Sequence, residues 1–250
     1  MSVINTEPIK SLPHANARTE IMRLQVEEPR MLQAAVSNLG EVWDYSFARP
    51  ALENTPNIKG VCRYLDYLPN SKVISASELA YILRCGKVVL FNWENGAVDM
   101  RQGASAGKAH GLQANRILDS LGIGVNIPIV YSADWDAQPN EYEAIQAYLD
   151  AAHTQGRPPG IYGKNAMVHY MLSNSHAVIG WTTLAWLYGQ KVSPLTHLFQ
   201  DGVNSPNGTD HNVILKPNWG FFPNSHPVPT PVPVSHPHKK KVSPNGTQRR

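Results

Sequence analysis

Short apolar runs, separated by helical or loop stretches, are the feature of this chain that most restricts its fold. The runs fall at residues 41–45, 60–65, 87–93, 127–133, 159–162, 183–187, 196–200 and 212–215. Alternation of such runs with helices is typical of βα units that build a parallel sheet. We therefore predict an α/β fold, a (β/α) barrel of the TIM type, with a doubly wound open sheet as the main alternative.

Helical patterns lie between several of the apolar runs. Residues 104–121 are rich in alanine, and residues 164–172 form a short apolar stretch. Residues 140–153 open with Asn140 and Glu143 in capping-box spacing. The barrel segment is short for eight βα units, so some outer helices are expected to be short or replaced by loops.

Three segments differ in composition. Residues 1–40 suggest a short helical extension, because an apolar stripe with helical spacing precedes Gly40. Residues 41–222 hold the barrel pattern. Residues 223–250 alternate proline with small residues and then carry three lysines, which favours an extended, disordered tail.

The charge of the chain is unevenly distributed. The formal net charge is +3, but residues 223–250 contain five basic side chains and no acidic one, so the remainder has a net charge of 3 − 5 = −2. A mildly acidic body disfavours a nucleic-acid partner. No apolar run is long enough to cross a membrane, and no secretory signal opens the chain. We expect a soluble protein that is made in a cytoplasm.

Cys62 and Cys85 are the only cysteines, and both lie in apolar surroundings. We interpret them as small buried thiols. A metal site needs more ligands than these cysteines and scattered histidines supply, so neither a metal nor another cofactor is expected.

Acidic residues stand at the ends of the expected strands. Asp134 and Asp136 follow one apolar run two residues apart, and side chains with that spacing on a strand point the same way. Asp44 and Glu94 follow two other runs, and Asp210 precedes the last. In a parallel barrel the carboxyl ends of the strands form the catalytic rim.

Carboxylates that converge on one rim suit the hydrolysis of a glycosidic bond. This reaction needs a protonated acid and a second carboxylate. Repulsion within the Asp134–Asp136 pair should raise one pKa, so we expect Asp136 to be the acid and Asp134 its ionised neighbour. Asp44 and Asp210 would flank the scissile bond. The competing interpretation is that Asp136 only caps a loop.

Further residues near the strand ends are candidates for substrate binding. They are Glu94, Trp93, Tyr64, Arg63, Trp135, Tyr162, Trp186 and Gln200. Flat aromatic rings can stack on the C–H faces of sugars, although aromatic side chains at strand ends also serve in packing.

Five motifs, in this order, resemble a known family. They are VWDY (42–45), VCRYL (61–65), PIVYSADWDA (128–137), GIYG (160–163) and DHNVILKP (210–217). Together they are similar to the glycoside-hydrolase-like domain of actinobacterial proteins and their phages. That family is related in layout to the Chalaropsis-type lysozymes, which are muramidases.

The resemblance implies a barrel with an acidic rim and a role on peptidoglycan or another bacterial wall glycan. In the lysozyme relatives an Asp-x-Glu pair ends the fourth strand, and its Glu is the acid. The corresponding pair here is Asp134-x-Asp136. Asp44 matches the aspartate of the first strand, and Asp210 matches that of the last.

These observations predict a muramidase-like protein, encoded by a phage, that acts on bacterial cell-wall polysaccharide. It would be found in the virion, or in the host cytoplasm before release to the wall. The alternatives are a non-catalytic wall-binding module and a structural, tail-associated virion protein. In the latter case residues 1–40 would dock to other virion proteins.

Overall fold

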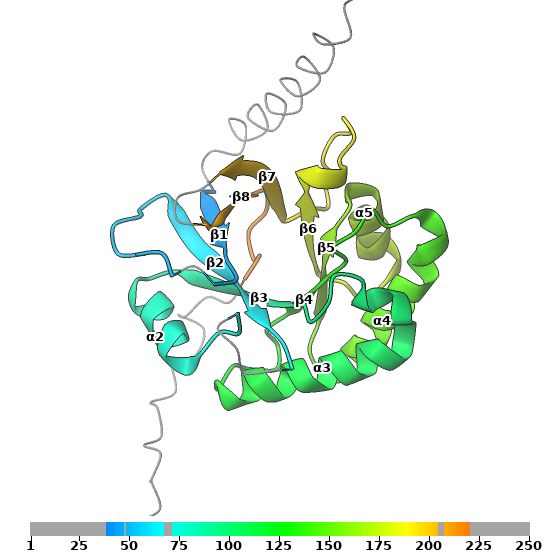
Figure 1. Ribbon diagram of the computed structural model, residues 1–250, viewed down its shortest axis with the longest axis horizontal. Coiled ribbons are helices and arrows are strands. Elements are labelled where there is room, and N and C mark those ends of the chain that lie inside the picture. Colours follow the sequence, from blue (N-terminus) through cyan, green and yellow to red (C-terminus); the bar gives the residue numbers. More distant parts are fainter. Residues whose placement is uncertain (1–38, 48, 68–71, 205–207, 221–250) are drawn as a thin grey trace, which may run out of the picture.

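The computed structural model describes residues 39–47, 49–67, 72–204 and 208–220. Its eight strands close into a barrel in sequence order (Figure 1). They are β1 (Glu41–Asp44), β2 (Ile58–Leu65), β3 (Val88–Trp93), β4 (Ile129–Ser132), β5 (Pro159–Gly163), β6 (Ile179–Thr183), β7 (Leu198–Asn204) and β8 (Asp210–Ile214). The prediction of a barrel is thus confirmed, and the open sheet is wrong.

Strand direction departs from an all-parallel barrel at one place. Each neighbouring pair from β1 to β7 is parallel, whereas β8 runs antiparallel to both β7 and β1. The segment between β7 and β8 is too short for a crossover helix, so the chain must return as a hairpin. In consequence Asp210, the first residue of β8, pairs with Asp44, the last residue of β1.

Helices cover only part of the barrel. The described helices are α2 (Ala76–Arg84), α3 (Gly103–Ser120), α4 (Tyr142–His153) and α5 (Asn165–Asn174), with the 3-10 turns η1 (Asp99–Gln102), η2 (Pro139–Glu141) and η3 (Leu184–Trp186). Figure 1 shows α2 beside β2 and β3, and α3 to α5 along the side of the barrel formed by β3 to β6. No α-helix of the described chain lies outside β7, β8 and β1.

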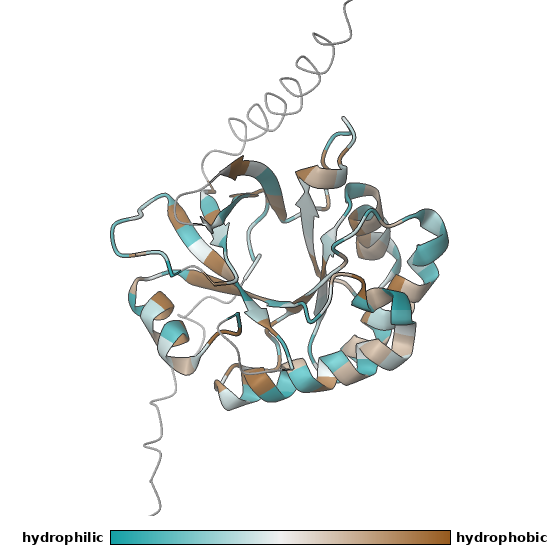
Figure 2. Cartoon of the chain, viewed as in Figure 1, coloured by the Kyte–Doolittle hydropathy of each residue, from teal (hydrophilic) through white to brown (hydrophobic). Residues whose placement is uncertain are grey.

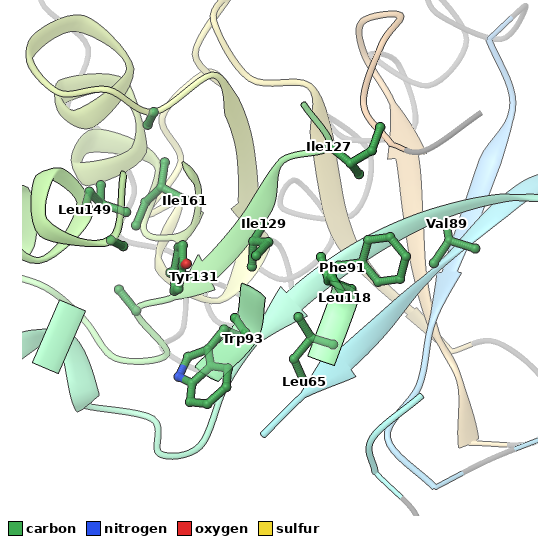
Figure 3. Close-up of a cluster of buried hydrophobic side chains, with 14 of the residues drawn as sticks. Leu65, Val89, Phe91, Trp93, Leu118, Ile127, Ile129, Tyr131, Leu149 and Ile161 are labelled. Carbon is green, nitrogen blue, oxygen red and sulfur yellow. The ribbon is translucent and has the colours of Figure 1, made fainter. Parts of the chain in front are cut away.

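Two apolar layers hold the barrel together. Because side chains alternate along a strand, Val88 and Leu90 of β3 belong to the cluster inside the barrel, whereas Val89 and Phe91 belong to the cluster beneath the helices. Figure 3 shows this outer cluster, in which Phe91 and the other outward side chains of β3 to β5 meet residues of α3 and α4.

Helices α3 and α4 carry hydrophobic and hydrophilic residues in turn, as Figure 2 shows, and bury one face each. Their backbones approach closely at Gly107, where an added Cβ would overlap the main chain of Tyr148. A glycine is therefore required for this helix pair to pack as it does.

Three local predictions need correction. The sixth strand is Ile179–Thr183, and the stretch predicted as that strand is mostly η3 and its cap. The capping box before α4 is formed by Gln138 and Glu141, and not by Asn140 and Glu143 as predicted. The Glu141 carboxylate accepts a 2.8 Å hydrogen bond from the backbone N–H of Gln138. Cys62 is buried and free as predicted, whereas Cys85 is only partly buried.

Candidate active site

Asp44 lies at the centre of a hydrogen-bond network inside the barrel, with 1 % of its surface exposed. Tyr64 Oη donates to Oδ1 (3.2 Å), and Asn212 Nδ2 and Gln200 Nε2 donate to Oδ2 (2.8 and 3.2 Å). Burial raises the pKa of Asp44 to about 7, and the charge of Asp210 adds to this effect, although the three donors oppose it. Asp44 therefore keeps its proton to a much higher pH than an ordinary aspartate does.

The donors to Asp44 are themselves held in place. Trp181 Nε1 donates to Asn212 Oδ1 (2.7 Å), and Tyr162 Oη donates to Gln200 Oε1 (2.8 Å). These bonds fix which end of each amide faces Asp44, so both amides present N–H groups to it.

Asp210 lies beside Asp44 at the same end of the barrel but is exposed to solvent. Burial raises the pKa of its carboxyl group. Asp210 lines a pocket of about 380 Å³, here called the rim pocket. The other lining residues are Thr183, Leu184, Ala185, Tyr188, Gln200, Gly202 and His211.

Glu94 and Asp134 follow β3 and β4 at this rim. Lys72 Nζ lies 3.0 Å from Glu94 Oε1. Burial raises the pKa of both carboxyl groups, whereas the charge of Lys72 lowers both. Burial also raises the pKa of Tyr162, and the charges of Asp134, Asp44 and Glu94 raise it further. Each of these three acids therefore lies near enough to Tyr162 for its charge to act on the phenol, as expected for residues at the same ends of β1, β3 and β4.

Asp136 does not share this environment. Lys164 Nζ lies 2.6 Å from Oδ1, and Tyr188 Oη donates to Oδ2 at 2.8 Å. These two partners lower the pKa of Asp136, which is the opposite of the rise expected for an acid. The pKa shifts are thus the reverse of those expected, because the pKa of Asp134 is raised and that of Asp136 is lowered; which of the two is the acid stays a prediction.

The error comes from extending strand geometry too far. Strand β4 ends at Ser132, so neither aspartate has strand spacing. The chain turns after Asp134, whose amide donates to Ala97 O (3.0 Å), and Ala137 N closes a tight turn onto Trp135 O (2.8 Å). The two carboxylates consequently meet different partners.

Three of the residues predicted to bind substrate are buried and contact other parts of the protein instead. Trp93 is 1 % exposed and packs against Tyr67 on the outer side of the barrel, with ring centroids 5.1 Å apart. Trp135 is also buried, and the Arg101 guanidinium covers its ring at 4.9 Å. Arg63 is fully buried and binds backbone carbonyls and Glu78. These predictions are corrected because large side chains near strand ends alternate between rim and core.

Trp186 lies in η3, is partly buried and does not line the rim pocket. Tyr64, Tyr162 and Gln200 do enter the Asp44 network, as described above. Sequence reasoning missed Asn212, although its position two residues after Asp210 on a strand is a usable signal. It also missed Lys72, Lys164 and Tyr188, which come from loops and carry no such signal.

Within the described ranges no three histidine, cysteine or acidic side chains are grouped as a metal site would require. Likewise, none of the described helices is long and apolar enough to span a bilayer.

A barrel with a ring of carboxylates at one rim is the arrangement found in glycoside-hydrolase-like proteins. The family model for the Rv2525c-like, glycoside hydrolase-like domain matches residues 51–241, so the chain belongs to this family and the resemblance drawn from the motifs is confirmed. The match begins after β1, so Asp44 lies outside the matched segment.

Solved structures share the fold. The Tat-secreted protein Rv2525c of Mycobacterium tuberculosis, crystallised with L-tartrate, is 22 % identical over 73 % of this chain and 98 % of its own, with a TM-score of 0.66. An uncharacterised protein of B. stearothermophilus is 18 % identical over 70 % of this chain and 95 % of its own, with a TM-score of 0.53. No curated protein matches the chain.

Proposed function

We propose that the protein hydrolyses a glycosidic bond in a bacterial cell-wall glycan, in the manner of a muramidase. The observation that carries this proposal is the convergence of Asp44, Glu94, Asp134 and Asp210 on one rim, each with a raised pKa. Protonation of a leaving oxygen requires a carboxylic acid that keeps its proton to a higher pH than an ordinary aspartate or glutamate does.

Asp134 is the proton donor in this proposal. Asp134 is exposed to solvent and has no side-chain hydrogen-bond partner among the described residues. Partial desolvation by the neighbouring protein atoms raises its pKa. Asp210, also exposed, is the second carboxylate, which activates water or stabilises the sugar cation. Asp44 is too deeply buried to touch a glycan, so it is a positioning residue whose protonation sets the charge beside Asp210.

The test is release of new reducing ends from purified wall preparations. We expect Asp134→Asn and Asp210→Asn each to lower the rate by about 100-fold or more, the usual contribution of general acid–base groups. Asp150→Asn, a surface substitution of the same chemistry, should leave the rate unchanged. If the wild type releases no more reducing ends than a control without protein, the hydrolytic proposal fails. If Asp136→Asn alone abolishes release, Asp136 is the acid after all.

Binding of wall glycan without cleavage is the second candidate. It is favoured by the ion pair between Lys164 and Asp136, the position that the lysozyme resemblance assigns to the acid. Co-sedimentation with wall material that survives in Asp134→Asn, together with no release of reducing ends by the wild type, would support this function.

The phage origin and the location in a virion remain predictions. The docking of residues 1–40 to other virion proteins also remains one, because residues 1–38 lie outside the described chain. If the docking prediction holds, deleting residues 1–40 abolishes particle assembly and leaves the melting temperature of the barrel unchanged. Normal assembly of the deleted form would contradict it.

A further inference from the structure

The lining of the rim pocket includes one exposed tyrosine that none of the catalytic roles above uses. Tyr188 lies between β6 and β7, in the segment drawn in yellow in Figure 1, and 60 % of its surface is exposed. Among the described residues that line the pocket, it is the only phenylalanine, tyrosine or tryptophan. The pocket therefore has one flat aromatic wall that a ligand can reach.

The aromatic residues that the sequence suggested for sugar stacking do not supply such a wall. Four of them are at most 9 % exposed: Trp93, Trp135, Tyr64 and Tyr162. The fifth, Trp186, does not line the rim pocket. An aromatic platform at this pocket must therefore be Tyr188.

The backbone of Tyr188 has a conformation that a tyrosine rarely adopts. Its φ is +51°, and that of Gly189 is +73°. The N–H of Gln190 donates to the carbonyl of Leu187 at 3.0 Å and closes the turn. Turns with two successive positive φ values favour glycine, asparagine or aspartate, and a bulky residue is unusual there. The turn itself gains nothing from a tyrosine, so the side chain points to a role outside the turn.

An ion pair holds the ring of Tyr188 from one side. Tyr188 Oη donates to Asp136 Oδ2 at 2.8 Å, and Lys164 Nζ lies over the ring, 5.6 Å from its centroid. Lys164 Nζ also lies 2.6 Å from Asp136 Oδ1, so both contacts come from one ion pair. Neither Asp136 nor Lys164 lines the rim pocket, so the face of the ring opposite Lys164 is the one that the pocket presents.

The other walls of the rim pocket suit a neutral sugar ring. Leu184 and Ala185 add apolar surface, and the oxygens of Thr183 and Asp210 can bind sugar hydroxyls. The described lining contains no lysine or arginine, so a sugar that bears a carboxylate is disfavoured beside Asp210. The volume of about 380 Å³ lies in the lower part of the range of ligand pockets, about 300–1,000 Å³.

We propose that the rim pocket is a subsite for a neutral pyranose unit, and that Tyr188 is the platform on which the C–H face of this sugar stacks. Asp136 and Lys164 are positioning residues, because they contact Tyr188 and not the sugar. The choice of a glycan rests on the function proposed above, whereas the stacking role rests on the exposed ring and the ion pair that holds it.

The test is isothermal titration calorimetry with chitotetraose, a neutral tetrasaccharide, in an Asp134→Asn background that prevents turnover. We expect Tyr188→Asn to weaken binding about tenfold, because it removes one aromatic stacking contact. The melting temperature should not fall, since asparagine tolerates a left-handed turn. Tyr170→Ala, which removes an exposed tyrosine from α5, is the matched control and should leave the affinity unchanged.

A double-mutant cycle tests the positioning role of Asp136. Tyr188→Phe keeps the ring but loses the hydrogen bond to Asp136, so we expect a smaller loss of affinity than in Tyr188→Asn. Asp136→Asn should weaken binding when Tyr188 is present and have less effect when Tyr188→Phe is already in place. Equal effects in the two backgrounds would overturn the positioning role.

The subsite is overturned if chitotetraose does not bind, or if Tyr188→Asn binds it as tightly as Tyr170→Ala does. Tetraglucuronate with β-1,4 linkages, which has a carboxylate on every unit, should bind about tenfold more weakly or worse, and equal binding of the two probes would overturn the preference for a neutral sugar. Binding that depends on Tyr188, with no release of reducing ends by the wild type, keeps the subsite and rejects hydrolysis. Hydrolysis by a protein whose binding is indifferent to Tyr188 does the reverse.

Discussion

Replacing Asp44 by asparagine should stabilise the fold at alkaline pH. The pKa of Asp44 rises from 3.8 to about 7 on folding, chiefly through burial. Between these values the native state keeps a proton that the unfolded state has lost, so stability falls as pH rises from about 4 to 7. At 1.36 kcal/mol per pKa unit, the ionised group costs about 4 kcal/mol at pH 8.

Asparagine can replace the carboxylate with little rearrangement. Its oxygen can accept the bonds that Asn212 and Gln200 now donate to Oδ2, and its amide can donate to Tyr64 Oη. The Asp44→Asn protein therefore avoids the cost of ionisation while keeping the network closed.

Urea unfolding of the wild type and Asp44→Asn at pH 4 and pH 8 measures this effect. We expect similar stabilities at pH 4 and an advantage for Asp44→Asn of roughly 2–4 kcal/mol at pH 8. Asp150→Asn, on the surface, controls for the general effect of removing one charge. Parallel pH profiles for the wild type and Asp44→Asn would refute the reasoning.

Three other substitutions test the fold and the rim. Gly107→Ala should lower the free energy of unfolding by about 1–3 kcal/mol, since its methyl group would overlap the main chain of Tyr148. Arg63→Met should lower the free energy of unfolding by about 3–5 kcal/mol, because the Glu78 carboxylate loses its buried ion-pair partner. Asp136→Asn should speed hydrogen exchange in the loop after β6, because it weakens the contact with Tyr188. In the wild type the same change should appear only at a pH below the ordinary range of an aspartate, since the pKa of Asp136 is lowered.

Matched variants show what would contradict these predictions. Gly111→Ala places its Cβ 3.0 Å from Ala152, so it should cost less than Gly107→Ala, and equal losses would refute the overlap argument. Arg116→Met, on an exposed part of α3, is the control for Arg63→Met and should leave the free energy of unfolding unchanged; equal losses would refute the ion-pair argument. Unaltered exchange in Asp136→Asn would mean that Asp136 does not hold the loop.

The sequence was sufficient to predict the barrel because its buried strands are continuous apolar runs. Residues 87–93 are an example, since almost every position of β3 is buried on one side or the other. The sixth strand was placed wrongly because it is not a continuous apolar run. Its residues Ile179–Thr183 include glycine and two threonines, whereas the more apolar stretch after it packs as a 3-10 turn.

The candidate site was only partly predictable for a different reason. Asp44 and Asp210 lie in strands, where period-two geometry fixes their direction. Asp136 lies in a loop, and its partner Lys164 is 28 residues away in sequence. Whether a carboxylate is free or paired depends on such distant contacts, which spacing within one motif does not encode.

The candidate active site depends on the antiparallel direction of β8. If β8 ran parallel to β1, Asp210 would open the strand at the opposite end of the barrel, four residues or about 13 Å along the strand from the end where Asp44 lies. Because the strand is antiparallel, Asp210 and Asn212 approach Asp44 from the rim, and Asn212 becomes its strongest donor at 2.8 Å. The small number of residues between β7 and β8, which forces the antiparallel pairing, therefore brings Asp210 and Asn212 to Asp44.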